Sequence, residues 1–279
     1  MKNLMLFLII TLFFTLSGKQ IDAQILNGAY ARNDIVQKKP MALPSVREAD
    51  VFWSKKVWRI IDLREKMNLP LYYPTQEMDG RENLITLLLD GISTNQITPY
   101  ADDDFKTPMS YQQVQVNFNA QPQTVSHLDF DTGETITDTI EGKINKDEIK
   151  QYMLKEEWYF DKQSSTLNVR IIGIAPIRLY VRENDPTRET QRSQVFWIYY
   201  PDIRNLLATH LAINPNNDAS QMSFDDIFIK RIFNSFITKE SNVYNNRFIS
   251  DYLSGKEAML ESKRIENEIF NFEQDLWEY

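Results

Sequence analysis

The sequence predicts an α+β fold with a helical N-terminal part, a central and mainly antiparallel β-sheet, and a helical C-terminal part that ends in a long helix. Apolar residues recur at helical spacing between residues 45 and 91. Between about residues 114 and 199 the pattern changes to the two-residue period and short apolar runs that strands show. Helical spacing returns after residue 200. Helices and strands that occupy separate stretches of a chain are typical of the α+β class.

Residues 1–23 have the three parts of a secretory signal peptide. Lys2 supplies positive charge, residues 4–16 form an apolar run, and Ala23 is a small residue at the expected cleavage site. The run is too short to span a bilayer, which takes about 20 residues. The chain has no cysteine, so no lipid can be attached to a new N-terminal cysteine. We therefore expect cleavage after Ala23 and a mature protein in the periplasm.

Residues 24–44 are expected to form an extended N-terminal arm. They carry few large apolar residues, show no periodicity and include Pro40 and Pro44. The sequence leaves open whether this arm is a disordered tail or wraps a neighbouring subunit. Residues 45–279 are predicted to form a single α+β domain, and the change of period places any subdomain boundary near residues 100–110.

Two helices are predicted in the first part of this domain. Ser45 and Glu48 have the spacing of a capping box, and Pro70 ends the first helix. The second helix is predicted to start at Asp79 and to close at Gly91. The apolar residues of the first helix fall on one face: Trp53, Val57, Ile60 and Ile61.

The middle of the chain predicts strands. Alternation indicates a strand at residues 114–118, and residues 128–130 and 135–140 flank a likely turn sequence, Asp-Thr-Gly, at 131–133. Pro176 has no backbone N–H to donate, so it is expected at a sheet edge or at a β-bulge. The remaining predicted strands are residues 152–160, 167–174, 177–181 and 195–199, with a hairpin loop at 161–165.

The last third is predicted to be helical again. Pro201 opens a short helix, and Ser223 caps another that is expected to carry its apolar face as far as Phe236. The long final helix follows Gly255. Its seam is spaced 4, 3, 4, 3, and either packs on its own domain or docks on another subunit. The residues of this seam are Ile265, Ile269, Phe272, Leu276 and Tyr279.

The sequence offers no recognisable catalytic site, so we predict no catalytic residue, metal ligand or cofactor. The chain has two histidines, His127 and His210, and no cysteine, too few for a zinc site. The acidic turn around Asp129 and Asp131 departs from the calcium-loop pattern, although a structural calcium there stays open. A net charge of −8 disfavours both nucleic acid and direct docking on anionic lipid.

Aromatic residues are abundant, at 12% of the chain, and protein interfaces use aromatic side chains as anchors. Two tyrosine pairs precede prolines at the ends of predicted elements, where a ring is more easily left exposed. The final helix offers the other candidate contacts. The candidate partner-binding residues are Tyr72, Tyr73, Tyr199, Tyr200, Ile265, Ile269, Phe272 and Leu276.

Several segments together resemble the family of the gliding motility protein GldN, called PorN in non-gliding relatives. The resemblance extends over nearly the whole mature chain, and residues 236–251 fit it as well. The segments that carry it are Trp58-Arg-Ile-Ile-Asp-Leu-Arg-Glu-Lys-Met-Asn-Leu-Pro-Leu-Tyr-Tyr-Pro74, Arg81-Glu-Asn-Leu-Ile-Thr-Leu-Leu-Leu-Asp-Gly91, Phe196-Trp-Ile-Tyr-Tyr-Pro201 and Phe224-Asp-Asp-Ile-Phe.

The resemblance implies a non-catalytic periplasmic subunit of the type IX secretion system and gliding machinery, at the inner face of the outer membrane. It implies a ring, with self-association, built with an outer-membrane lipoprotein of the GldK or PorK type. It also implies coupling to a trans-envelope motor subunit of the GldM or PorM type, and membrane contact only through the lipoprotein. The alternatives are a periplasmic glycoside hydrolase that uses two carboxylates, and a small-ligand binding protein.

Overall fold

The computed structural model describes residues 38–121, 123–128, 135–140, 142–181, 187–215, 217 and 221–275. The chain divides into two compact units, Met1–Asp34 and Ile35–Tyr279, and all described residues belong to the second. The predicted signal peptide, the first part of the predicted arm, the acidic turn at 129–134, and Leu276 and Tyr279 of the final-helix seam lie outside the described residues.

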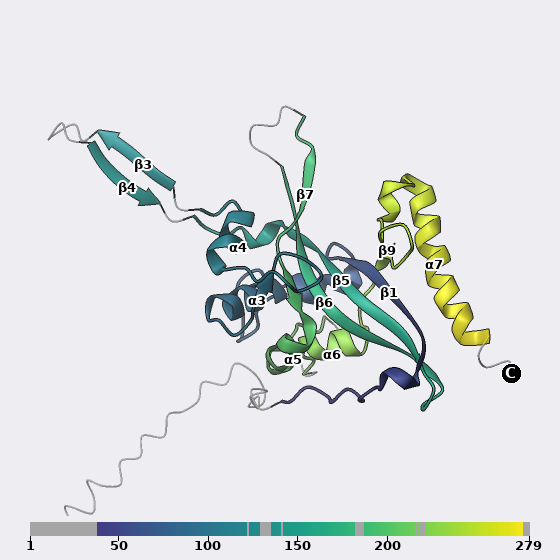
Figure 1. Ribbon diagram of the computed structural model, residues 1–279. Helices are drawn as coiled ribbons and strands as arrows, with labels where there is room; N and C mark the ends of the chain where they lie inside the picture. The colour runs from purple at the N-terminus through teal and green to yellow at the C-terminus, as the bar shows by residue number, and fades with distance from the viewer. Residues whose placement is uncertain are drawn as a thin grey trace, which may run out of the picture. The chain divides into compact units, whose positions relative to one another are not determined.

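A seven-stranded antiparallel sheet forms the centre of the second unit (Figure 1). Its strand order is β2-β8-β6-β5-β1-β9, and β7 pairs with β6 beside β8. β5 and β6 form a long hairpin across the predicted loop at 161–165. The strands are β1 (Val51–Asp62), β2 (Pro99–Tyr100), β5 (Ile149–Asp161), β6 (Thr166–Val181), β7 (Thr190–Gln194), β8 (Trp197–Tyr199) and β9 (Phe236–Glu240). A separate two-stranded sheet pairs β3 (Gln123–Leu128) with β4 (Thr135–Ile140).

The α-helices fall into two groups, one that follows β1 and one that follows β8, and together with the antiparallel sheet they confirm the predicted α+β class and the long final helix. Every helix of the described residues is too short or too polar to cross a membrane. The α-helices are α2 (Leu69–Tyr72), α3 (Leu84–Ser93), α4 (Tyr111–Asn117), α5 (Tyr200–Thr209), α6 (Phe224–Ile229) and α7 (Gly255–Asp275). The 3₁₀ turns are η2 (Glu48–Asp50), η3 (Lys66–Asn68), η4 (Lys146–Glu148) and η5 (Ile249–Asp251).

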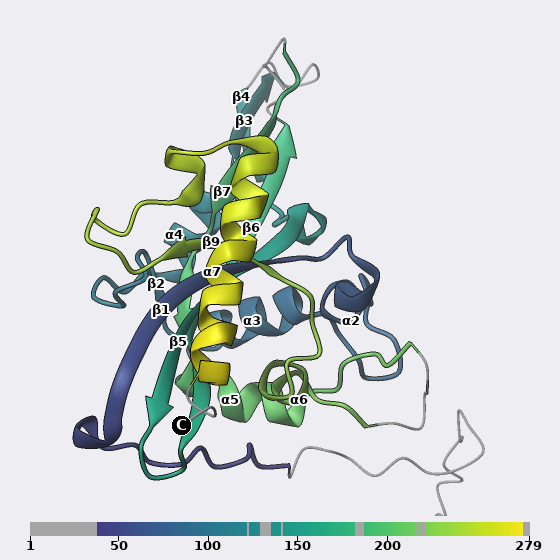
Figure 2. The ribbon, with the colours of Figure 1, turned by 90° about the vertical axis from the view of Figure 1, so that its right-hand side faces the viewer.

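The sheet carries its largest core where α3, α5 and α6 cover it (Figures 1 and 2). Tyr152 and Leu154 of β5 join this core, whereas Met153 between them joins a smaller cluster on the other face with Trp58 and Trp197. Successive side chains of a strand point to opposite faces, which places β5 between the two clusters. A third cluster lies beneath α7, at the β9 edge. The first and third clusters thus pack helices that are far apart in sequence against the same sheet.

The predicted helix over residues 51–62 is wrong, because this segment is strand β1. Its last six residues are all buried, and it lies between β5 and β9, with a partner strand on either side. A strand covered on both faces loses the polar and apolar alternation that identifies strands in a sequence. The capping residue Ser45 also caps nothing, because η2 starts after Arg47 and has no side-chain cap.

Other local predictions were also overturned. Residues 114–118, predicted as a strand, belong to α4 and its C-cap, and a capping box formed by Ser110 and Gln113 starts that helix. α3 is capped by Asn83 rather than Asp79, and Gly91 lies inside it. There Gly91 lets Ile97 approach, since an added Cβ would stand 2.5 Å from the Ile97 side chain. The helix that Ser223 caps ends at Ile229, so Phe236 starts a strand instead.

The described part of the predicted arm, residues 38–44, runs along its own domain. Arg204 on α5 donates a hydrogen bond to the carbonyl of Met41 at 2.7 Å, and Arg170 donates to the carbonyl of Pro44. Lys38 forms an ion pair with Asp226 at the start of α6. Contact between residues 24–37 and a neighbouring subunit stays a prediction.

Asp62, at the end of β1, is a pH-dependent contributor to stability. Hydrogen bonds from Arg64 lower its pKa from 3.8 to about 2, and Gln151 donates to it at 3.1 Å. Because the folded pKa lies below the ordinary value, this stabilisation is complete above pH 3.8 and is lost as the pH falls through about 2. Asp62→Asn should therefore lower the free energy of unfolding by about 2 kcal/mol at pH 7. Urea unfolding of both proteins at pH 7 and pH 3 checks this, and a difference that grew at pH 3 would contradict it.

A candidate protein-interaction groove

The sequence builds a groove where α7 lies beside the edge strand β9. Ile265 and Ile269 of α7 are buried against Val57 and Ile237, which docks the helix on the sheet. Between these apolar contacts, the backbone amide of Ile237 donates a hydrogen bond to the Ser262 hydroxyl at 3.0 Å. A small polar residue on the buried face of α7 thus satisfies an outward-facing amide of the edge strand. Figure 2 shows α7 running along this side of the sheet.

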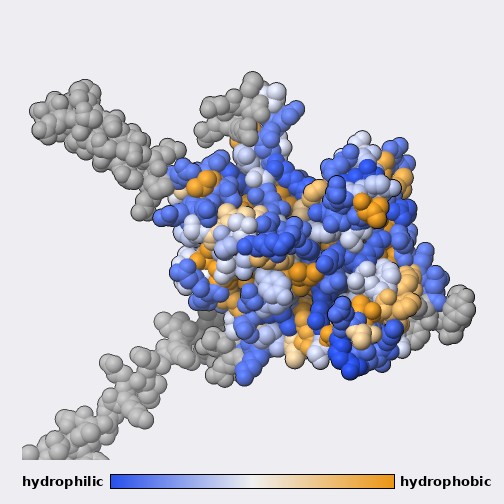
Figure 3. Space-filling view, in the orientation of Figure 1, coloured by the Kyte–Doolittle hydropathy of each residue, from blue (hydrophilic) through white to orange (hydrophobic). Residues whose placement is uncertain are grey.

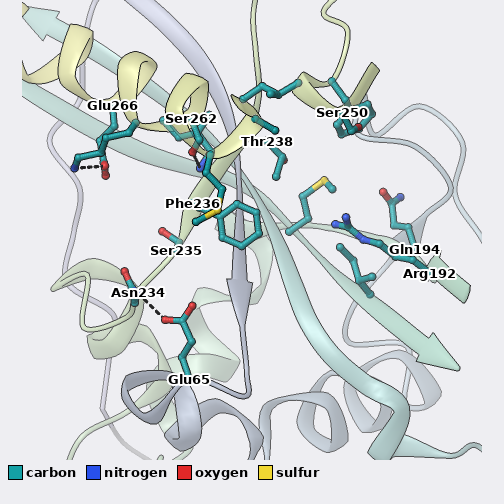
Figure 4. Close-up of a pocket in the computed structure, with 18 residues that line it drawn as sticks. Glu65, Arg192, Gln194, Asn234, Ser235, Phe236, Thr238, Ser250, Ser262 and Glu266 are labelled. Carbon is teal, nitrogen blue, oxygen red and sulfur yellow. Dashed lines mark hydrogen bonds and ion pairs between the residues drawn. The ribbon is translucent and has the colours of Figure 1, made fainter. Parts of the chain in front are cut away.

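The groove has a volume of about 870 Å³ and a mainly apolar lining. In Figure 4 Phe236 lies near its centre, Ser262 and Glu266 descend from α7, and Arg192 and Gln194 of β7 close the far side. Phe236 and Met259 line it while 44% and 74% exposed, so the groove is open to solvent. The small-ligand hypothesis requires an enclosed apolar pocket, and this groove does not have that shape.

A second hollow of about 450 Å³ continues the groove along α7 and shares Lys263 and Glu266 with the first. Phe270, which is 57% exposed, lines this second part together with Trp158. Figure 3 shows hydrophobic side chains on this side of the molecule separated by hydrophilic ones. The groove therefore has an apolar region at each end of its length and charged residues in its middle.

Charged side chains beneath the groove form two linked pairs. Arg59 of β1 donates to Glu266 at 2.7 Å and to Ser235 at 3.0 Å. Arg231, which follows α6, forms a two-pronged ion pair with Glu156 of β5, with oxygen distances of 2.8 and 3.3 Å. Glu156 is completely buried, and burial lowers the pKa of Arg59. These pairs hold α7 and the α6 end against the sheet.

The charge state of the groove does not suit acid catalysis. Burial raises the pKa of Glu266, but Lys263 and Arg59 outweigh that effect and leave this pKa below its ordinary value. A general acid for glycoside cleavage needs a raised pKa. A second carboxylate of the larger hollow, Glu65, accepts a hydrogen bond from Asn234 at 2.6 Å. Within the described ranges, no group of three or more His, Cys, Asp or Glu residues could hold a metal ion.

The predicted tyrosine contacts lie at α2 and at the junction of β8 with α5. The Tyr72 hydroxyl accepts a hydrogen bond from Lys150 at 2.6 Å, while Tyr73 is 46% exposed. Tyr199 is 37% exposed and packs edge-on to Phe105. Tyr200 is buried and donates its hydroxyl hydrogen to Asp225 at 3.1 Å, so its ring lies in the core.

The final-helix candidates lie at the other edge of the sheet. Ile265 and Ile269 are in the core beneath α7, and Phe272 stacks on Trp53 with ring centroids 4.5 Å apart. The described part of the seam thus packs on its own chain, and the groove beside it brings together other residues. Phe236, Met259 and Phe270 were not predicted as contacts. Met259 and Phe270 could have been found, because they are apolar residues of the final helix that lie outside its predicted seam.

His210 is the histidine whose side chain the structure describes. It follows α5 as the C-cap residue, and its Nδ1 lies 2.9 Å from the carbonyl of Leu206. Its Nε2 lies 3.7 Å from Glu82, and burial raises the pKa of that carboxyl group. This arrangement links the C-terminal end of α5 to the segment before α3.

A protein-family model described as gliding motility associated protein GldN matches residues 46–278. The match therefore covers the central sheet, α7 and the groove between them. No curated protein matches the chain.

Proposed function

This chain belongs to the GldN family of gliding motility associated proteins, and we propose that it is a non-catalytic structural subunit of the type IX secretion and gliding machinery. The observation that carries the proposal is the family match, which runs through every strand of the central sheet and through α7. Its site of action is the periplasm, which the signal-like sequence at residues 1–23 supports.

The proposed partners are a lipoprotein that anchors the subunit at the outer membrane and a motor subunit. The chain has no cysteine to carry a lipid, and its net charge of −8 opposes binding to anionic lipid. We propose, as the family resemblance implies, that an outer-membrane lipoprotein of the GldK or PorK type supplies the anchor and shares a ring with copies of this chain. A motor subunit of the GldM or PorM type couples to that ring.

The open groove and exposed aromatic side chains support a role in binding proteins. Tyr73 after α2 and Tyr199 of β8 expose rings, and Phe236 and Phe270 expose rings along the groove. Aromatic residues at a partly exposed surface provide large contact area at low entropic cost. Two such regions would let one subunit contact more than one neighbour.

Co-expression tests this function. Residues 24–279 are produced with the lipoprotein, purified in mild detergent through a tag on the lipoprotein, and imaged by electron microscopy. We expect stoichiometric co-purification and ring-shaped particles that contain both chains. The matched control is a lipoprotein whose lipid-bearing cysteine is replaced, which should keep the pair and lose membrane association. A monomer that ignores the lipoprotein under both conditions would refute the proposal.

A further inference from the structure

α7 carries a second stripe of residues, distinct from its buried seam, along the side that borders the groove. The stripe has a spacing of 3, 4, 3, 4, 3, the spacing of a coiled-coil seam. Its two apolar members are exposed, Met259 by 74% and Phe270 by 57%. In order, the stripe residues are Lys256, Met259, Lys263, Glu266, Phe270 and Glu273.

The two flanks of α7 differ in how their charges are satisfied. On the flank away from the groove, Arg264 pairs with Glu261 and Glu268, and Lys55 of β1 also pairs with Glu268. On the stripe, Glu266 pairs with Lys263 at 2.8 Å and with Arg59 of β1 at 2.7 Å. At the ends of the stripe, Lys256 and Glu273 form no ion pair with any residue that the structure describes. The stripe therefore presents two apolar side chains and two charges of opposite sign that have no ion-pair partner among the described residues.

The order of these residues is self-complementary when the helix is reversed. If a second copy of α7 lies antiparallel, Lys256 faces Glu273 of the second copy and Met259 faces Phe270 of the second copy. Lys263 then faces Glu266 of the second copy, and a two-fold axis repeats each contact. An antiparallel two-stranded coiled coil has the same layers, in which an a position of one helix faces a d position of the other. A parallel arrangement would oppose equal charges in four of the six layers.

We propose that the α7 stripe is a self-association surface whose occupant is α7 of a second copy of this chain, bound antiparallel about a two-fold axis. Charge order selects the occupant, because only a helix with the reversed order of charges satisfies both ends of the stripe at once. Opposite charges fix the register of such contacts and like charges oppose the wrong one. The contact does not depend on the secretion role proposed above.

This contact is expected to be weak in isolation. Met259 and Phe270 are separated by 11 residues of helix, or about 16 Å, so the apolar contact is short. Stable interfaces usually bury about 800 Å² on each partner. We therefore expect dimers at high micromolar protein concentration, which sedimentation velocity over a range of concentrations can detect.

The end charges provide the decisive variants, because both can be reversed without touching the core. Lys256→Glu and Glu273→Lys should each weaken self-association about tenfold or more, since each places like charges at both ends of the dimer. Mixing the two variants should restore association as a 1:1 heterodimer, because every end contact then joins opposite charges. Leu260→Asp is the matched control: Leu260 is 60% exposed on α7, lies outside the stripe, and should leave association unchanged.

Cysteine pairs then test the geometry, and the cysteine-free chain gives each variant a single thiol. A mixture of Met259→Cys and Phe270→Cys proteins should form a covalent heterodimer with a short bismaleimide. Met259→Cys alone should give little dimer, because its two thiols would lie about 16 Å apart. Efficient linking of Met259→Cys to itself, or mixed charge variants that fail to associate, would overturn the proposal. A wild-type chain that stays monomeric at every concentration would overturn it as well.

Discussion

Ile265→Asp should release α7 from the sheet and lower the free energy of unfolding by about 4 kcal/mol. Ile265 is fully buried in the cluster that also contains Val57, Ile237 and Ile269. The change removes an apolar side chain from this cluster and places an unpaired carboxylate there, and both effects destabilise the fold. Loss of the helix would also remove the Ser262 hydroxyl from the amide of Ile237.

Urea unfolding measures this loss, and limited proteolysis locates it. Cleavage should begin within residues 255–275 before the central sheet is cut. Met259→Asp is the matched control, because it introduces the same charge on the same helix at a position that is 74% exposed. Its effect on stability should stay within about 0.5 kcal/mol. A loss for Ile265→Asp that is as small as the loss for Met259→Asp would mean that α7 contributes little to the fold.

Arg231→Met should lower the free energy of unfolding by about 3–5 kcal/mol, because it leaves the fully buried Glu156 without its cation. Arg231 makes both prongs of the ion pair, and the Trp158 ring nitrogen donates a further hydrogen bond to the Glu156 carboxylate at 3.2 Å. Methionine keeps most of the aliphatic length, so lost packing contributes little. Chemical denaturation at pH 7 provides the measurement.

Two further variants distinguish two contributions to the loss of stability: leaving a buried charge without a partner, and losing an ion pair as such. Arg264→Met removes an arginine that contacts three carboxylates but is 53% exposed, and should cost less than about 1 kcal/mol. The double variant Glu156→Gln/Arg231→Met should be more stable than Arg231→Met alone, because the buried charge is gone. A double variant that is less stable than the single one would contradict this explanation.

The C-terminal elements could be predicted from sequence because their signals are local. Ser223 caps α6 with a capping box, and the spacing of Ile265 and Ile269 correctly predicted a long final helix. β1 could not be predicted in this way. Its apolar residues fit a helical face as well as a strand, and its conformation depends on pairing with β5 and β9, more than 80 residues away in sequence.

The groove was beyond prediction for the same reason. It combines residues from β7, β9, η5 and α7 that only the fold brings together. The buried charges were missed because a charged residue in an apolar run is usually read as exposed. Arg59 and Glu156 lie on neighbouring strands and face α7 and Arg231, which no spacing in the sequence reveals. The tyrosine candidates were chosen from pattern alone, which did not separate the exposed Tyr199 from the buried Tyr200.

The cover that α7 provides for β9 has a consequence for how the protein is made. Ribosomes build chains from the N-terminus, so the helix that carries Ser262 emerges after every strand of the central sheet. Until then, β9 has an uncovered outer edge, and such an edge can pair with another nascent chain. Prematurely terminated products would keep that edge permanently. The synthesis of α7 therefore decides whether β9 of a newly made chain is covered or is left open to aggregation and to chaperones and proteases.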